Sequence, residues 1–393
     1  MNCTNRILKD LSAPIRALYV SSYIPRKCGI ATFTKDLTNA INMMNPSALA
    51  QIAAMDNGIS ENLRYPHEVK FRIRQEEKAD YEEVAKYVND TGEIDVVVIE
   101  HEFGIFGGES GELIIDLVEK INKPVIATLH TVTENPSARG KKIINRLGNK
   151  CQFLVVMLET SRELLTKIYE VDRKKIMVIP HGVPDFPRLG SGLVKKKFDL
   201  KGKVVMSSIN LVSESKGIEY AIAAMPEIIK EIPNLLYLVV GETHPVVKQV
   251  DGEKYRHKLK SMVRSLGLQK HVKFINKYIP LSQLIDYVAA SDMYVTPYLD
   301  PQQSASGSLA YAIGAGKACI STPFLYAKEM FRLGCGKLVP FKDSEGIARA
   351  VIETWADKTA RVECEEKAYE LGRTMTWVNV AHQYFHLLHH AVE

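Results

Sequence analysis

Residues 95–131 read DVVVIEHEFGIFGGESGELIIDLVEKINKPVIATLHT. A β-branched run at 95–99 is followed by a glycine-rich loop, a helical apolar pattern over 111–121 and a second β-branched run at 125–129. A strand, a helix and a strand in this order form a βαβ unit, in which the two strands run parallel in one sheet. This stretch therefore predicts an α/β fold with a doubly wound parallel sheet.

The same alternation extends through the whole chain. Further strands of the first half are expected at 17–21, 69–73, 153–156 and 176–179, with helices near 31–41, 81–88, 141–147 and 161–169. Strands resume at 204–209, 235–240, 272–275, 293–296 and 318–321, after a stretch rich in proline, glycine and lysine that is typical of an exposed linker. Because 393 residues exceed what one hydrophobic core usually organises, we expect two domains.

The expected domain boundaries follow from this pattern. We expect a first Rossmann-like domain over 1–185, a hinge linker over 186–200, a second Rossmann-like domain over 201–375 and a terminal helix over 376–393. The terminal helix keeps an apolar stripe at near-helical spacing, so we expect it to cross back and pack on the first domain. Parallel α/β domains bind ligands at the carboxyl ends of their strands, and two such faces across a central cleft can hold a nucleotide and a second substrate.

Composition excludes several classes of protein. With 46% hydrophobic and 25% charged residues, the chain is globular rather than disordered or collagen-like. A formal charge of +5 is too small for this length to indicate nucleic-acid binding, but it suits anionic small molecules or an anionic membrane surface. No apolar run is long enough to span a membrane, the first twelve residues lack the apolar core of a signal peptide, and the six cysteines are widely spaced. We therefore expect a cytoplasmic protein, at most peripheral to the inner membrane face.

Two loops of the first domain are candidate ligand-binding loops. The first, PRKCGIATF at 25–33, leads from the first strand into a helix, with Gly29 where a backbone must approach an anion or a sugar. The alternative is a glycine in a tight turn. The second loop follows the strand at 95–99 and combines glycines with aromatic rings, which suits an acceptor; otherwise its phenylalanines pack into the core. Its candidate acceptor-binding residues are His101, Glu102, Phe103, Gly104, Phe106, Gly107 and Gly108.

A histidine ends the next strand. His130 stands in the phrase TLHT at 128–131. A histidine at a strand end is often structural, but at this edge of the sheet it can hydrogen-bond a sugar hydroxyl or a developing charge. Position alone leaves the two interpretations equally open.

The second domain offers a phosphate site. The segment DPQQSASGSLAY at 300–311 runs into an apolar helix, whose first turn supplies free amides, hydroxyls and the positive end of the helix dipole. The candidates there are Ser306, Gly307, Ser308 and Leu309. Lys216, at the entry to another helix, can add a point charge to the same phosphate, unless it is simply a solvated lysine. No Asp-x-Asp pair is present to hold a divalent ion, so we expect no metal and no cofactor.

These phrases together resemble the GT-B fold glycosyltransferases, specifically the retaining family 4. The resemblance covers nearly the whole chain and rests on Gly29, TLHT at 128–131, VIPHGV at 178–183, Lys216-Gly217 and the segment 303–321. It implies that Gly29 faces the diphosphate and sugar of the donor, that His130 contacts the donor sugar and that Lys216 neutralises the diphosphate. It also makes the first domain the acceptor side and the second the nucleotide-sugar-binding domain.

The chain departs from the family pattern at three positions. The arginine expected before Lys216 is replaced by Leu211, and the two glutamates of the E-x7-E motif are replaced by Gln303 and Tyr311. Gln303 can still hydrogen-bond the sugar and Tyr311 the ribose, although neither supplies negative charge. The surrounding phrases resemble a bacterial subgroup that carries the same substitutions.

The resemblance implies transfer of a hexosyl unit, mannose or glucose, from a nucleoside-diphosphate sugar to a hydroxyl of a sugar, glycan or lipid-linked acceptor. Configuration at the anomeric carbon would be retained, with His130, Lys216 and Gln303 in catalytic roles and without a metal. One alternative is a non-catalytic GT-B protein that binds nucleotide sugars, suggested by Leu211, Gln303 and Tyr311. A GT-B epimerase or phosphorylase is a further alternative.

Overall fold

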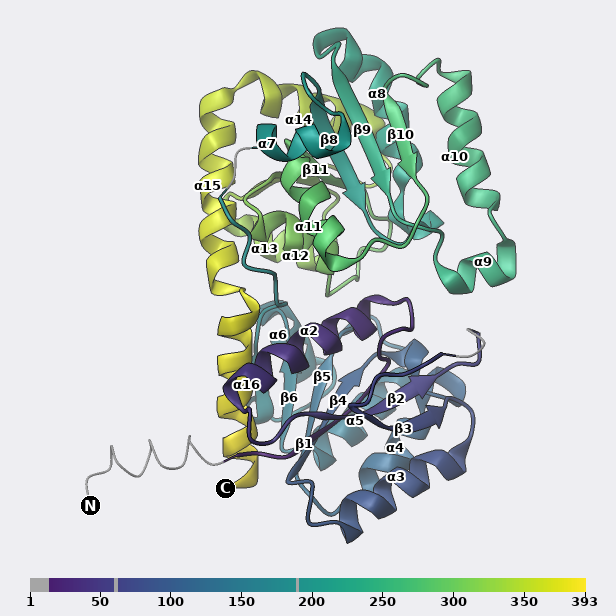
Figure 1. Cartoon of the computed structure of the whole chain (residues 1–393), viewed down its shortest axis with the longest axis vertical. Coiled ribbons are helices and arrows are strands. Elements are labelled where there is room, and N and C mark those ends of the chain that lie inside the picture. Colours follow the sequence, from purple (N-terminus) through teal and green to yellow (C-terminus); the bar gives the residue numbers. More distant parts are fainter. Residues whose placement is uncertain (1–13, 60–62, 189–190) are drawn as a thin grey trace, which may run out of the picture. The chain divides into compact units, whose positions relative to one another are not determined.

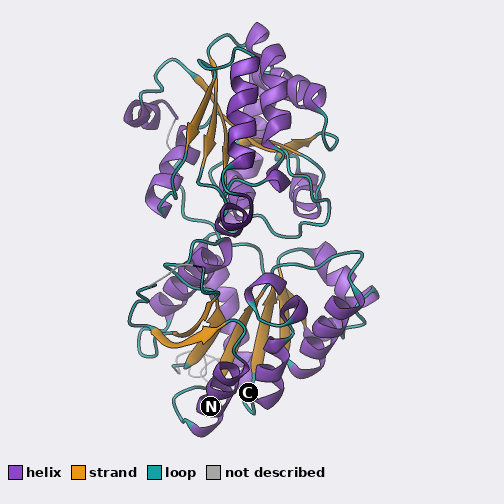
Figure 2. Cartoon of the chain, turned by 90° about the vertical axis from the view of Figure 1, so that its right-hand side faces the viewer, coloured by secondary structure: helices purple, strands orange, loops and turns teal. Residues whose placement is uncertain are grey.

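The computed structural model describes residues 14–59, 63–188 and 191–393. The chain divides into two compact units, one reaching to Gly182 and including Trp377–Glu393, the other formed by Val183–Thr376. Each unit is a parallel β-sheet with helices on both faces (Figure 1). Figure 2 shows the strands of each unit enclosed between these helices. The predicted fold class, two doubly wound Rossmann-like domains, is confirmed.

The first unit has a seven-stranded sheet in the order β3-β2-β1-β4-β5-β6-β7. Its strands are β1 (Ala17–Ser21), β2 (Gln51–Asp56), β3 (Val69–Arg74), β4 (Val96–His101), β5 (Val125–Leu129), β6 (Phe153–Val156) and β7 (Ile176–Val178). Its helices are α2 (Gly29–Met44), α3 (Lys78–Asp90), α4 (Leu113–Lys120), α5 (Ala138–Lys150), α6 (Glu159–Lys167) and α16 (Trp377–Val392). The central strands β1, β4 and β5 are buried along their whole length, as expected of a sheet covered on both faces.

The second unit has a six-stranded sheet in the order β10-β9-β8-β11-β12-β13. Its strands are β8 (Val204–Ile209), β9 (Leu235–Val240), β10 (Val272–Ile275), β11 (Met293–Thr296), β12 (Ala318–Ser321) and β13 (Gly336–Leu338). Its helices are α7 (Ser191–Lys195), α8 (Ile218–Glu231), α9 (Pro245–Asp251), α10 (Lys254–Ser265), α11 (Leu281–Ala290), α12 (Gly307–Gly314), α13 (Leu325–Met330), α14 (Ser344–Ala356) and α15 (Lys358–Thr374).

Two strands were missed by the sequence patterns. β2 reads QIAAMD and has a single β-branched residue, yet it pairs with β1 on one side and β3 on the other and is almost wholly buried. β13 reads GKL and is a short, largely exposed edge strand. Propensity fails in both cases because neighbouring strands, rather than the residues themselves, determine the pairing.

The structure assigns the segments at the predicted domain boundaries to one unit or the other. The described part of 186–200, predicted as a hinge linker, belongs to the second unit, where Lys195 Nζ lies 2.6 Å from the Asp292 carboxylate. The helix α16 belongs to the first unit, where the hydroxyls of Tyr384 and Thr128 are 2.9 Å apart. Hinge motion stays a prediction.

The strand orders locate the ligand-binding edge of each sheet. Chain order reverses between β1 and β4 in the first unit and between β8 and β11 in the second. Doubly wound sheets bind ligands at such switch points, outside the carboxyl ends of the strands. The loops that follow these four strands are therefore where a site is to be sought.

Candidate functional site

In the second unit, the loop after β8 and the loop after β11 are tied together. Gly217 has φ +58°, and a Cβ at this position would lie 2.0 Å from the carbonyl oxygen of Pro297. Ser215 accepts a backbone hydrogen bond of 2.9 Å from the amide of Leu299. Glycine is therefore required here both by the left-handed conformation and by close approach, and the contact fixes the position of Lys216.

Lys216 lies over an aromatic ring. Its Nζ is 4.0 Å from the centroid of Tyr298, and within the described parts of the chain it forms no ion pair. Tyr298 in turn shares a hydrogen bond of 2.7 Å with the hydroxyl of Ser308, in the first turn of α12. The structure thus brings together Lys216 and the start of α12, which are more than ninety residues apart in the sequence.

The backbone amides in the first turn of α12 differ in whether a protein acceptor occupies them. The Ser306 hydroxyl accepts from the Leu309 amide at 3.4 Å, and its carbonyl accepts from the Ala310 amide at 2.9 Å. The Leu309 amide is therefore not free to bind an anion, and the Leu309 side chain is fully buried. The amides of Gly307 and Ser308 have no protein acceptor in the described ranges, so these two remain to receive an anion.

The two residues that replace the E-x7-E glutamates differ in their surroundings. Gln303 is half-buried, and its Nε2 donates a hydrogen bond of 2.8 Å to the carbonyl of Ala305. Tyr311 is only 5% exposed, and its ring meets Phe186 edge-on at 6.3 Å. Gln303 can reach a ligand, whereas Tyr311 lies on the buried face of α12.

Sequence reasoning missed two residues at this edge. Tyr298 links Lys216 to α12, and its only sequence signal is an aromatic residue just after a buried strand. Asn210 follows β8 directly, and both polar atoms of its side chain are buried with no hydrogen-bond partner among the described residues. The backbone carbonyl oxygen of Asn210 would lie 1.9 Å from a Cβ at Gly241, so the two backbone segments are closely packed.

In the first unit, Gly29 begins α2 beside open space. The preceding Cys28 caps this helix, since its Sγ accepts from the Ala31 amide at 3.3 Å and lies 3.1 Å from the Ser22 hydroxyl. A Cβ at Gly29 would meet nothing within 4 Å. The backbone there leaves room for a ligand, although its conformation does not itself demand glycine.

His130 is bound to a buried carboxylate. Its Nε2 lies 2.9 Å from Glu100 Oε2, and its ring meets Phe33 of α2 edge-on at 4.8 Å. His130 is 5% exposed and Glu100 is fully buried. Sequence reasoning missed Glu100, although a carboxylate at the end of an otherwise apolar strand is a signal.

The predicted acceptor loop divides into buried and exposed residues. His101 ends β4, fully buried, with its ring stacked on Phe106 at 5.8 Å; burial, together with the nearby His130, lowers the pKa of His101 to about 3. A Cβ at Gly107 would lie 1.8 Å from the carbonyl oxygen of Gln75. These three residues serve the packing of the unit, so the predicted direct contacts with an acceptor do not fit them. The predicted residues that reach the surface are Glu102, Phe103, Gly104 and Gly108.

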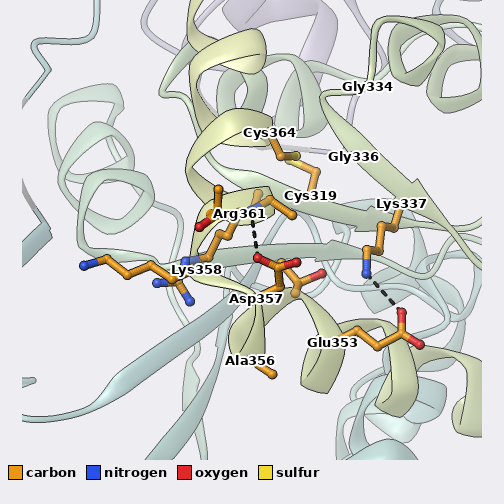
Figure 3. Close-up of a pocket in the computed structure, with 14 residues that line it drawn as sticks. Cys319, Gly334, Gly336, Lys337, Glu353, Ala356, Asp357, Lys358, Arg361 and Cys364 are labelled. Atoms are coloured by element: carbon orange, nitrogen blue, oxygen red, sulfur yellow. Dashed lines mark hydrogen bonds and ion pairs between the residues drawn. The ribbon is translucent and has the colours of Figure 1, made fainter.

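A separate pocket lies at the opposite edge of the second sheet. It has a volume of about 930 Å³, and its lining includes Cys319 near the start of β12 and Gly336 at the start of β13 (Figure 3). Lys337 and Glu353 form an ion pair of 3.0 Å in its wall. Because this pocket adjoins the amino ends of the strands, it is not part of the edge that carries Lys216.

The described residues contain neither a metal-ligand cluster nor a membrane-spanning helix. No group of three or more histidine, cysteine or acidic side chains there could hold a metal ion. Of the helices in the same ranges, none is long and apolar enough to cross a membrane.

Comparison with known proteins adds relatives at low sequence identity. The family model described as Glycosyl transferases group 1 matches residues 193–371. A phosphatidyl-myo-inositol mannosyltransferase of Mycolicibacterium smegmatis is 22% identical over 263 residues, which are 66% of this chain and 63% of that protein. The chain thus spans less than two thirds of this relative's length.

Solved structures match almost the entire chain. Anabaena HepE in complex with UDP and glucose has a TM-score of 0.75 at 14% identity, over 95% of this chain and 99% of that one. Sucrose-phosphate synthase of Thermosynechococcus elongatus has a TM-score of 0.75 at 16% identity, over 95% and 98%. Residues 193–371 thus resemble a group 1 glycosyl transferase domain, and the chain as a whole has the GT-B fold and resembles glycosyltransferase family 4.

Proposed function

We propose that this protein transfers a hexosyl unit, mannose or glucose, from a nucleoside-diphosphate sugar to a hydroxyl acceptor, with retention at the anomeric carbon. The observation that carries the proposal is the cluster of Lys216, Tyr298 and Ser308 at the carboxyl edge of the second sheet. A lysine without an ion pair beside two free helix amides is suited to a diphosphate. The group 1 match over the same unit supports this assignment.

The proposed mechanism concentrates charge stabilisation on the leaving group. Departure of the nucleoside diphosphate gives an oxocarbenium-like sugar and develops negative charge on the diphosphate. Lys216 and the amides of Gly307 and Ser308 stabilise that charge in the transition state. A diphosphate oxygen then takes the proton of the acceptor hydroxyl, so neither a protein base nor a metal ion is needed.

The sugar and the acceptor are assigned to other residues. Gln303 is assigned a hydrogen bond with the transferred sugar, and His130 is assigned the contact with the donor sugar that the resemblance implies. The exposed part of the loop at 101–108 receives the acceptor, a sugar, glycan or lipid-linked hydroxyl. A lipid-linked acceptor would bring the protein into peripheral contact with a membrane. The HepE complexes with UDP and with UDP-glucose make uridine nucleotides the first donors to try.

The test is a panel of UDP, GDP and ADP sugars with the purified chain. Calorimetry measures binding, release of nucleoside diphosphate measures turnover, and NMR of the product gives the anomeric configuration. We expect one donor to bind and to turn over with retention, equally with and without EDTA. Inversion, or activity lost with EDTA and restored by magnesium, would contradict the mechanism.

A non-catalytic nucleotide-sugar-binding role is the second candidate. It is favoured by the internal hydrogen bond of Gln303 and by the burial of Tyr311, because neither residue supplies the missing negative charge. Binding of a donor with neither hydrolysis nor transfer, across sugar, glycan and lipid-linked acceptors, would support this role instead.

A further inference from the structure

We infer that Glu100 is a positioning residue for His130, holding the proton on Nε2 and fixing the orientation of the ring. The inference rests on the proposed function for its catalytic meaning, but its structural content is independent of activity. It concerns a residue that the sequence patterns did not single out.

Glu100 places a carboxyl group in the interior of the unit, where an ionised side chain costs free energy. It is fully buried near the end of β4, a strand in which every residue is buried. A carboxylate removed from water is tolerated only when it is paired and hydrogen-bonded. Its hydrogen-bond partners are His130 Nε2 at 2.9 Å and the Thr128 hydroxyl at 3.4 Å, both from the neighbouring β5 or the residue after it.

His130 is the ionisable ring that is hydrogen-bonded to this carboxylate. Burial lowers the pKa of His101 to about 3 and that of His181 to about 4, so both rings are neutral at neutral pH. Burial, reinforced by the carboxylate of Glu100, raises the pKa of the Tyr19 and Tyr384 phenols, so these also stay uncharged. Hydrogen-bonded contact with a carboxylate favours a protonated Nε2.

The ring is also fixed from other directions. The His130 amide donates a hydrogen bond of 3.0 Å to the carbonyl of His101, and Phe33 packs edge-on against the imidazole. Thr128 is held by Tyr384 of α16 at 2.9 Å, which orients its hydroxyl beside Glu100. Four elements, β4, β5, α2 and α16, therefore determine one orientation of the imidazole.

The chemical consequence concerns what Nδ1 does. With Nε2 protonated, Nδ1 accepts a hydrogen bond when the ring is neutral and donates one when the ring is cationic. A neutral ring suits a sugar hydroxyl, and a cationic ring suits developing negative charge. Without Glu100, Nε2 would lose the carboxylate acceptor that holds its proton.

The first test reads the tautomer directly. The full chain is labelled with ¹⁵N-histidine, and long-range ¹H–¹⁵N correlations assign each ring nitrogen as protonated or bare. The His130 signal is identified by its loss in His130→Gln. We expect a protonated Nε2 in the wild type and in Glu100→Gln, whose amide oxygen can still accept, and a shift toward mixed tautomers in Glu100→Leu. A bare Nε2 in the wild type would overturn the inference, and so would an unchanged signal in Glu100→Leu. If Glu100→Leu does not fold, the wild type and Glu100→Gln still decide.

A matched control separates positioning from general loss of a buried acid. Asp56 is also a buried carboxylate of the same sheet, at the end of β2, and it pairs with Arg72. Asp56→Leu should lower the melting temperature without changing the His130 tautomer. A tautomer change in Asp56→Leu equal to that in Glu100→Leu would count against a specific role of Glu100.

The second test reads function, with UDP-glucose as donor and UDP as the binding probe. Glu100→Leu should lower kcat at least tenfold while the Kd for UDP changes less than threefold, and Glu100→Gln should recover most of kcat. Equal losses in kcat and UDP affinity, or no loss in either, would refute the positioning role. If the wild type turns over no donor, the proposed function fails, and the tautomer measurement still decides the structural inference.

Discussion

Replacing Lys216 by methionine removes the positive charge and keeps most of the side-chain stem. Lys216 forms no ion pair in the described ranges and lies 4.0 Å from the ring centroid of Tyr298. A hydrogen bond from a charged group contributes about 1.5–3 kcal/mol. Because Lys216 is only half-buried, we expect the lower half of this range, which corresponds to roughly a 10- to 45-fold loss of affinity for a nucleoside diphosphate.

The assay is calorimetric titration with whichever of UDP, GDP and ADP binds the wild type best. Lys216→Arg should recover most of the affinity, because it keeps the charge. The matched control is Lys258→Met, since Lys258 also lies over a tyrosine, 5.7 Å from the Tyr255 centroid in the same unit, and pairs with Glu219 at 3.2 Å. Both methionine variants should lower Tm by no more than about 4 °C, as expected for the loss of one cation–π contact. Affinity within twofold of the wild type in Lys216→Met, or an equal loss in Lys258→Met, would refute the reasoning.

Three further predictions concern His130, the two residues that replace the glutamates, and the pH dependence of stability. His130→Ala should lower turnover at least tenfold with nucleoside-diphosphate affinity nearly intact, because the diphosphate lacks the sugar that His130 contacts; parallel losses would argue against that contact. Gln303→Ala should also lower sugar transfer at least tenfold with nucleoside-diphosphate affinity nearly intact. Tyr311→Phe should leave turnover and nucleoside-diphosphate affinity unchanged, because the Tyr311 side chain is buried. Enzyme kinetics measure the turnover, and calorimetry measures the affinity. Burial lowers the pKa of His101 to about 3 and of His181 to about 4, from 6.5, so unfolding takes up protons below pH 6.5. Stability should therefore fall as the pH falls from about 6.5, by roughly 2 kcal/mol for each histidine at pH 5, and a melting temperature that is flat between pH 7 and 5 would contradict this.

The fold could be predicted because burial on both faces of a parallel sheet leaves a strong pattern. The runs at 95–99 and 204–209 are rich in β-branched residues, and the strands that they predicted, β4 and β8, are fully buried. β2 escaped because alanine and methionine in QIAAMD suit a helix as well as a strand, and only its two neighbours decide. Pairing partners are a tertiary property, which local propensity does not contain.

The candidate site could be predicted only in part, because chain position does not determine the direction of a side chain. His101 and His130 each stand at the carboxyl end of a buried strand. The His101 ring is stacked on Phe106, and neither of its nitrogens has a hydrogen-bond partner in the part of the chain that the structure describes. The His130 ring is bound to Glu100. No local pattern distinguishes them, since the difference arises from residues on other elements.

The replaced glutamates illustrate the same point on the donor side. Gln303 and Tyr311 are eight residues apart in sequence, but Gln303 lies in a loop, and Tyr311 is the fifth residue of α12 and packs against Phe186. A carboxylate at 311 would be desolvated in this packing, whereas a tyrosine fills the space with a neutral ring. The family resemblance therefore predicts where these two residues stand in the sequence, but it does not predict what surrounds their side chains. With neutral residues at both places, the charge of the leaving diphosphate would be met by Lys216 and the amides of Gly307 and Ser308, which is why removal of the Lys216 charge should separate a working donor site from a vestigial one.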